Sequence, residues 1–333
     1  MTPNTWHPGK LMETSGNYWK TFTLHTAVKL DVFSLIGENS LKAETLTVKL
    51  KGNSRAVTMF LNALVAMGLL LKENDHYKNT SESIKFLSKN SPSYVGYMIM
   101  HHHNLAESWL NMDQTLISGK PNRERSSHST EAHRESFLLG MFNNAMSIAP
   151  SLSEKLNLSG VKRLLDLGGG PGTYAIHFCL ANPGLMASVY DLPTTRPFAE
   201  KTIGRFGLSE KIDFIEGDFL EDEFTEIGQF DAVWLSHILH GERPENAENI
   251  IQKAVSVLSP GGKIFIHEFI LENTLDGPLF PALFSLNMLL GTEGGQSYSE
   301  KSLSDMLVRQ GAKDIKRLDF IGPTESGILS GMI

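Results

Sequence analysis

Short apolar runs alternate with helical stretches along the chain from about Val161 onward. Each run has the length of a buried strand, and we expect a helical stretch to follow each one. Such alternation predicts a doubly wound, mostly parallel α/β sheet that binds ligands at the carboxyl ends of its strands. The predicted strands of this part lie at 163–167, 187–191, 211–216, 230–235 and 263–269.

Two further strands are predicted near the end of the sequence, at 314–321 and 327–332. The segment Pro323–Ser326 separates them, so the two strands can pair as a terminal antiparallel hairpin. The expected sheet therefore has seven strands.

The first part of the chain has a different pattern. Helical segments from Thr21 are followed by two short strand-like runs, at 68–72 and 76–78, which frame a turn. This order of helices and hairpin is typical of a winged helix. The helix near 54–61 carries little positive charge, which favours a packing role over DNA contact. A cofactor-sensing winged-helix regulator stays open as a function of another class.

Long helices are predicted between Ser93 and Pro150. We therefore expect three parts: a winged-helix-like domain at 1–92, a helical connector at 93–155 and a sheet domain at 156–333. The run His101–His103 invites a metal hypothesis, but consecutive helical residues point about 100° apart and cannot converge on one ion. No metal site is predicted.

Composition excludes several classes. The chain has 333 residues, 41% of them hydrophobic, which is enough for two packed units. Its net charge of -7 argues against a nucleic-acid partner. No segment approaches the roughly 20 apolar residues that a membrane span requires, and the single cysteine, Cys179, cannot form an internal disulfide. We expect a cytoplasmic protein without a membrane partner.

The strand at 163–167 runs into a glycine-rich turn, Asp166-Leu-Gly-Gly-Gly-Pro-Gly172. Glycines accept backbone angles closed to other residues and let the main chain approach a ligand closely. The turn alone is ambiguous, because Gly170 and Gly172 also fit the G-x-G-x-x-G/A fingerprint of dinucleotide sites, with Asp191 at the expected distance.

Acids at successive strand ends favour S-adenosylmethionine over a nicotinamide dinucleotide. Asp166 suits the ammonium of an amino-acid tail, and Asp191 suits ribose hydroxyls. Asp218 and Phe219 suit an adenine amine and its ring. The predicted cofactor residues are Asp166, Gly168, Gly170, Gly172, Asp191, Leu192, Asp218, Phe219 and Ser236.

From about Val161 the chain resembles the class I S-adenosylmethionine-dependent methyltransferases, and in particular the plant-type small-molecule O-methyltransferase family. The blocks that carry the resemblance are 166–172, 190–193, 217–219, 238–240, 261–268 and 294–295. The resemblance implies a Rossmann-like fold with an antiparallel end. It also implies that the winged-helix part is a dimerisation domain, and so a homodimer.

Methylation of a hydroxyl requires an aligned acceptor, exclusion of water and removal of a proton. The resemblance implies that His240, just beyond the fourth strand of the sheet, is the general base and that Glu268 orients it. Strand alternation turns His267 to the opposite face from Glu268. His237 could line the acceptor pocket. With Glu242 it could suggest a metal, but no third ligand stands at a convincing spacing.

The resemblance also places Phe142, Met146, Asn287 and Met288 in the acceptor pocket, and with His237 they make up the predicted pocket residues. Two departures from the family pattern stand out. Gly241-Glu242 replaces the usual acid and tryptophan, and Ser297-Tyr298 replaces a second glutamate and a basic residue. We predict O-methylation of a small phenolic or enolic molecule, with S- or C-methylation left open.

Overall fold

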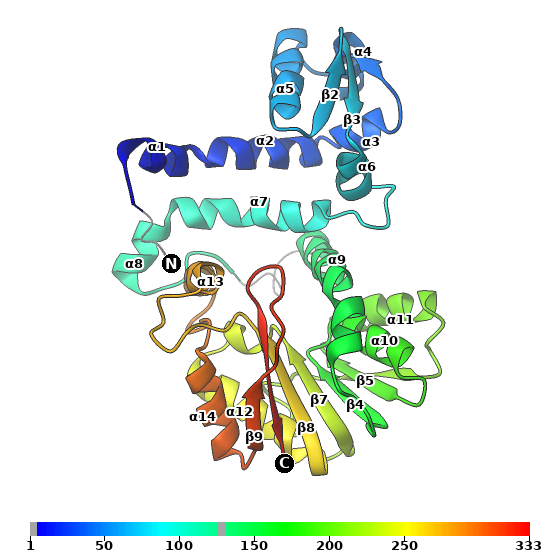
Figure 1. Cartoon of the computed structure of the whole chain (residues 1–333), viewed down its shortest axis with the longest axis vertical. Helices are drawn as coiled ribbons and strands as arrows, with labels where there is room; N and C mark the ends of the chain where they lie inside the picture. Colours follow the sequence, from blue (N-terminus) through cyan, green and yellow to red (C-terminus); the bar gives the residue numbers. More distant parts are fainter. Residues whose placement is uncertain (1–4, 125–130) are drawn as a thin grey trace. The chain divides into compact units, whose positions relative to one another are not determined.

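The computed structural model describes residues 5–124 and 131–333, and side chains of the second range from 137 onward. Contacts divide the chain into two compact units, Met1–Ala106 and Glu107–Ile333. Figure 1 shows the elements of both. The predicted connector at 93–155 is shared between these units, because helix α7 (Gly96–Leu110) runs across the boundary. The three-part division stays a prediction.

The N-terminal unit is mainly helical and carries a small antiparallel sheet of order β1-β3-β2. Besides the start of α7, its elements are α1 (Pro8–Gly16), α2 (Tyr18–Lys29), α3 (Val32–Ile36), β1 (Leu41–Lys42), α4 (Ala43–Leu50), α5 (Ser54–Ala66), β2 (Leu70–Glu73), β3 (His76–Asn79) and α6 (Ser81–Leu87).

The winged-helix pattern expected from the sequence is present. Asn53 caps α5 by accepting a hydrogen bond from the Ala56 backbone N–H, and strands β2 and β3 form the hairpin. The hairpin turns at Asn74, whose φ of 53° is one that asparagine tolerates better than most residues. Apolar side chains of α2, α3, α4 and α5 form the core beneath it.

A buried amide ties β3 to α3. The side chain of Asn79 is 2% exposed, and its Nδ2 donates to the carbonyl oxygens of Phe33 and Gly37, each at 2.8 Å. Buried carbonyls need such partners, because an unpaired polar group in the core costs free energy.

The histidines of α7 also lie in this unit. The His103 ring packs edge-on against the buried His25 ring of α2, with 5.5 Å between centroids. Burial, and the charges of His103 and His102, lower the pKa of His25 to about 4. His25 and His103 therefore behave mainly as packed rings.

The second unit contains the large sheet. Its elements are α8 (Met112–Ser118), α9 (Glu131–Lys155), β4 (Arg163–Leu167), α10 (Thr173–Ala181), β5 (Met186–Asp191), η2 (Pro193–Thr195), α11 (Arg196–Arg205), β6 (Ile212–Glu216), β7 (Phe230–Ser236), η3 (Leu239–Gly241), α12 (Pro244–Ser256), β8 (Leu258–Glu268), α13 (Leu279–Gly291), α14 (Glu300–Arg309), β9 (Lys313–Arg317) and β10 (Gly327–Met332).

Within the described residues, seven strands form this sheet in the order β6-β5-β4-β7-β8-β10-β9. Neighbours from β6 to β8 are parallel, and β10 is antiparallel to both β8 and β9. The predicted doubly wound sheet and its terminal hairpin are confirmed. One expectation is wrong: residues 217–229, between β6 and β7, form turns and no helix.

Alternate residues of the central strands enter two cores, one on each face of the sheet. Leu164 of β4 and Trp234 of β7 belong to one core, whereas Leu165 and Leu235 belong to the other. This alternation also decides which polar side chain faces which layer at the strand ends.

Across the residues that the structure describes, no helix combines the length and apolar character needed to cross a bilayer. The single cysteine, Cys179, is buried in α10.

Replacing Asn79 by alanine should destabilise the N-terminal unit by about 2–4 kcal/mol, because two buried carbonyls lose their donor. Urea unfolding, monitored by hydrogen exchange of residues 5–106, measures the change in the free energy of unfolding of this unit. Lys78→Ala, at the adjacent exposed position, is the matched control and should change stability by less than about 0.5 kcal/mol. Equal losses in the two variants would contradict the role of the buried amide.

Candidate active site

The glycine-rich turn after β4 has a backbone that only glycine adopts easily. Gly168, Gly170 and Gly172 have φ values of 68°, 54° and 76°. A Cβ on Gly168 would lie 2.6 Å from Cγ2 of Ile238, whereas a Cβ on Gly170 would meet no atom within 4 Å. The turn is therefore packed on one side and open above Gly170.

Asp191, at the end of β5, holds this turn in place. Its Oδ2 accepts a hydrogen bond from the Gly170 N–H at 2.8 Å, and its Oδ1 accepts one from the Leu192 N–H at 2.7 Å. Burial raises the pKa of Asp191, and these N–H donors oppose that rise. Both carboxylate oxygens thus already bind the loops that would surround a cofactor.

Asp166 is the buried acid of the turn, with 0% exposure. Its Oδ2 accepts a hydrogen bond from the Ala175 N–H at 3.3 Å, whereas Oδ1 is buried without a partner among the described residues. Burial raises the pKa of Asp166 to about 7. A buried carboxylate oxygen without a donor is suited to a cationic ligand.

Phe219 and Asp218 lie at the end of β6. The Phe219 ring flanks the glycine turn, with Cε1 3.5 Å from the place of a Gly168 Cβ. Asp218 uses Oδ1 to accept from the Leu220 N–H at 2.9 Å, which fixes the loop. The structure thus gathers the predicted cofactor residues of β4, β5 and β6 at the carboxyl edge of the sheet.

His240 and Glu268 meet at the same edge. His240 lies in the short helix η3 after β7, and Glu268 is the last residue of β8. His240 Nδ1 is 2.7 Å from Oε2 of Glu268, and the carboxylate is 2% exposed. We call these two side chains the His240–Glu268 pair.

Backbone donors fix the carboxylate of this pair. Oε1 of Glu268 accepts from the N–H groups of Leu239 at 2.9 Å and His240 at 3.3 Å, and Oε2 accepts from that of Phe269 at 3.3 Å. Burial opposes ionisation, but His240 and His237 overcome it and hold the pKa of Glu268 well below its usual range. Glu268 is therefore an anion at neutral pH.

Aromatic side chains pack against the His240 ring. The ring of Phe284 in α13 packs edge-on at 4.8 Å between centroids, and that of Phe269 lies nearly parallel at 5.9 Å. These rings leave the imidazole 13% exposed.

His237 lies between the pair and the sheet. Its Nδ1 is 3.6 Å from Oε2 of Glu268 and is buried without a hydrogen-bond partner in the described part of the chain. This contact turns the Nδ1 edge of the His237 ring to the carboxylate. The expectation that His237 lines the acceptor pocket stays a prediction.

His237, His240 and Glu268 also offer three ligand atoms within 4.8 Å of one another. The sequence suggests His237 with Glu242 and offers no third ligand, whereas the structure groups His237 with His240 and Glu268 and not with Glu242. A tetrahedral zinc site, with bonds of about 2.0–2.1 Å, needs ligand atoms about 3.3 Å apart. The 2.7 Å separation of Nδ1 and Oε2 in the His240–Glu268 pair fits a hydrogen bond better than two ligands of one metal ion.

His267 faces the opposite layer, as strand alternation predicts, and is fully buried. Nδ1 lies 3.0 Å from Oγ of Ser236 and 3.4 Å from the hydroxyl of Tyr174, and Nε2 lies 3.0 Å from Oγ of Ser326. Burial lowers the pKa of His267 well below its ordinary value. A neutral ring whose two nitrogens both have hydrogen-bond partners cannot act as a base toward a ligand. Ser236, a predicted cofactor residue, is one of these partners.

The predicted pocket residues of α13 lie near Phe284. Met288 is buried, and Oδ1 of Asn287 is buried without a partner within the described ranges. The Asn287 carbonyl accepts from Arg123 at 2.8 Å, which caps the end of the helix. Oγ of Ser297, at the position of the missing second acid, is also buried and unpartnered there.

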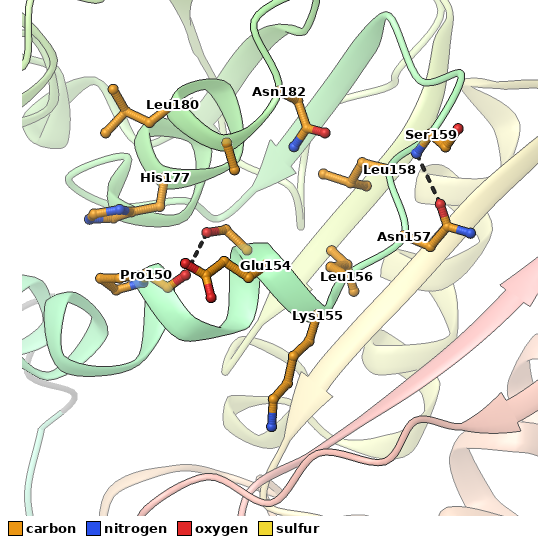
Figure 2. A pocket seen from close by; sticks show the side chains of 12 residues that line it. Pro150, Glu154, Lys155, Leu156, Asn157, Leu158, Ser159, His177, Leu180 and Asn182 are labelled. Carbon is orange, nitrogen blue, oxygen red and sulfur yellow. Dashed lines mark hydrogen bonds between the residues drawn. The ribbon is translucent and has the colours of Figure 1, made fainter.

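Two of the predicted pocket residues, Phe142 and Met146, lie in α9. Phe142 is half-buried, and Sδ of Met146 lies 3.3 Å from Nε2 of His177 in α10. His177 lines an open hollow of about 920 Å³ between the ends of α9 and α10 and the loop 156–159 (Figure 2). Most of the residues that line this hollow come just before β4 in the chain. The hollow therefore lies toward the amino ends of the strands, apart from the glycine turn.

The chain belongs to the O-methyltransferase family. The profile described as the O-methyltransferase domain matches residues 119–313, and the O-methyltransferase dimerisation domain matches residues 12–89. The chain is thus an S-adenosylmethionine-dependent methyltransferase. The alternative of a cofactor-sensing winged-helix regulator is not supported.

Individual relatives agree. The chain is 30% identical to the 3-hydroxy-5-methyl-1-naphthoate 3-O-methyltransferase of Streptomyces sahachiroi, over 99% of this chain and 96% of that one. It is 28% identical to the L-tyrosine C(3)-methyltransferase of Streptomyces lavendulae, over 92% and 87%. A solved O-methyltransferase family protein from Burkholderia thailandensis superposes with a TM-score of 0.89 at 25% identity, covering 98% of each chain.

Several residues around the site were not found from the sequence. Tyr174 and Ser326 contact His267, and Phe269 and Phe284 enclose His240. Phe269 directly follows Glu268, which was a usable signal. Tyr174 lies two residues after Gly172, and Phe284 lies three residues before Asn287, so both were close in sequence to predicted site residues. Ser326 has no such neighbour in the sequence.

His267 should still be neutral at pH 6.5, where a free histidine is half protonated, because burial lowers its folded-state pKa well below that value. Its contribution to stability is therefore complete above about pH 6.5 and is lost as the pH falls, since the unfolded chain then binds the extra proton. NMR of ¹⁵N-histidine-labelled protein checks this. A titration midpoint near 6.5 for His267 would contradict its assigned environment.

Proposed function

We propose that this enzyme transfers a methyl group from S-adenosylmethionine to a hydroxyl of a small aromatic acceptor, with His240 as general base and Glu268 as its orienting residue. The observation that supports this most strongly is the 2.7 Å contact between His240 Nδ1 and Glu268 Oε2. With Nδ1 donating to a buried carboxylate, the lone pair of the neutral ring is on Nε2, which is then the basic atom.

The cofactor residues are part of this proposal. Asp166 would take the ammonium group of the cofactor on its unpartnered Oδ1, and the open space above Gly170 admits the ligand close to the backbone. Asp191, Leu192 and Asp218 would meet the adenosine moiety, and Phe219 would cover the adenine ring. Ser236 supports the site through His267.

The bound cofactor supplies a methyl group activated by its sulfonium. His240 Nε2 accepts the proton of the acceptor hydroxyl, and Glu268 stabilises the resulting imidazolium through Nδ1. The rings of Phe269 and Phe284 keep water from the imidazole. Backbone donors hold the carboxylate, so it does not have to reorient when the charge appears on His240.

An aromatic acceptor suits the surroundings of His240, which are rings and the apolar helix α13. By their names, one relative methylates the 3-oxygen of a hydroxynaphthoate and another methylates L-tyrosine at C(3). Oxygen is favoured because the basic histidine is in place to remove a hydroxyl proton. Phe142, Met146, Asn287 and Met288 stay proposed pocket residues. A homodimer through the dimerisation domain and a cytoplasmic location complete the proposal.

His240→Gln should lower kcat by about 10²- to 10⁴-fold, because the glutamine amide cannot accept the proton of the acceptor hydroxyl. The affinity for S-adenosylhomocysteine should stay within about twofold. Transfer of labelled methyl groups to a panel of phenols and hydroxynaphthalenes measures kcat, and calorimetry measures the affinity. His76→Gln in strand β3 is the matched control and should retain full activity.

Unchanged kcat in His240→Gln would remove His240 as the base. Dialysis of the wild type against a chelator should also leave kcat unchanged. If activity were lost on dialysis and restored by Zn²⁺, the His240–Glu268 pair would bind a metal ion instead of forming a hydrogen bond.

Cofactor affinity should depend on the charge of Asp166. Its pKa of about 7 in the free protein means that the carboxyl is protonated below that pH, where it cannot pair with an ammonium group. The Kd for S-adenosylhomocysteine should rise by up to about tenfold per pH unit as the pH falls below 7, and level off above it. Calorimetry between pH 5.5 and 8.5 measures the profile.

Asp166→Asn is the matched variant, because it keeps the shape of the side chain and removes the titration. We expect weaker binding that no longer changes between pH 5.5 and 7. A profile identical to that of the wild type would show that Asp166 does not meet the charged part of the cofactor.

A further inference from the structure

His237 has an unusual backbone. Its φ is 57°, in the left-handed region that residues with a side chain rarely adopt. The conformation is held by a hydrogen bond of 2.9 Å from its own N–H to the carbonyl of His267. Its ring also packs between the rings of His267 and Phe269, at 4.4 Å from each centroid. Strained backbone of this kind persists where the surrounding structure requires it.

The strain aims a ring nitrogen at the carboxylate. His237 Nδ1 is 3.6 Å from Oε2 of Glu268, the same oxygen that takes the short contact from His240. Nδ1 is buried and has no hydrogen-bond partner in the described residues. Each oxygen of Glu268 already has two partners: Oε1 accepts from the N–H groups of Leu239 and His240, and Oε2 accepts from the Phe269 N–H and contacts His240 Nδ1. Oε2 is the oxygen that also faces His237 Nδ1.

We propose that His237 is a positioning residue that acts through Glu268: an N–H at its Nδ1 restrains Oε2 and keeps the carboxylate aligned on His240. This inference rests on the proposed function of the His240–Glu268 pair and deepens it. It replaces the expectation that His237 contacts the acceptor.

The charges fit this role. The groups that face His237 are the anion of Glu268, the neutral His267 and the ring of His240. A donor on His237 supports the anion both before and after His240 takes a proton. A carboxylate restrained from two sides has fewer orientations to lose when the imidazolium forms.

Two variants separate the contact from the backbone strain. Glycine adopts a positive φ freely and removes the imidazole, whereas asparagine tolerates this φ and places its amide nitrogen where the histidine has Nδ1. His237→Gly should lower kcat by about tenfold and leave the KM of the phenolic acceptor within about twofold. His237→Asn should recover kcat to within about threefold of the wild type.

The same two changes made in a Glu268→Gln background test the connection. If His237 acts through Glu268, then His237→Gly causes no further loss of kcat once Glu268 is altered. Losses that multiply, or a rise in acceptor KM with kcat preserved, would overturn the proposal and return His237 to the acceptor pocket.

A spectroscopic readout is independent of turnover. In ¹⁵N-histidine-labelled protein with S-adenosylhomocysteine, the Nδ1–H signal of His240 should shift in His237→Gly and return in His237→Asn. Identical His240 signals in all three proteins would also overturn the proposal. Failure of the base assignment is detected separately, as full activity in His240→Gln.

Discussion

A buried carboxylate hydrogen-bonded to an imidazole is the interaction on which the proposed chemistry of this enzyme depends. Glu268 is almost wholly removed from solvent, yet it stays ionised because three backbone N–H groups and His240 surround it. Burying an unpaired charge would be strongly destabilising, so the helix η3 and the end of β8 are tied to each other through this group. Its removal would disturb both the position of His240 and the local fold.

The alternation of a β-strand assigns different tasks to adjacent residues of β8. Glu268 faces the layer of η3 and α13, where it is charged and lies within hydrogen-bond distance of His240 Nδ1. His267 faces the layer of α10, where burial keeps it neutral and Ser236 and Ser326 occupy its nitrogens. In the proposed function Glu268 orients the general base and His267 supports the site, although both are ionisable and neighbours in sequence.

Much of this arrangement could be predicted from the chain alone. The strands of the sheet, its terminal hairpin and the glycine turn follow from local periodicity and glycine spacing, and β4 and β10 match the predicted bounds. The pairing of His240 with Glu268 was expected from the family resemblance, and it agrees with parallel strands that place their carboxyl ends together. The link between β6 and β7 was misjudged, because turns there connect the strands without a helix.

The remaining features depend on contacts that periodicity does not encode. The direction of His237 comes from a positive φ, which no spacing rule predicts for histidine. The enclosure by Phe284 comes from the packing of α13, and the contact of Met146 with His177 depends on how α9 lies on α10.

The central claim is that a histidine held by Glu268 removes the proton of the acceptor. Single-turnover methyl transfer to phenols of graded acidity, compared between the wild type and His240→Gln, tests it most directly. The ratio of the two rates should be largest for weakly acidic phenols and should approach one for phenols that are already ionised. A ratio that stays constant across the series would contradict the claim.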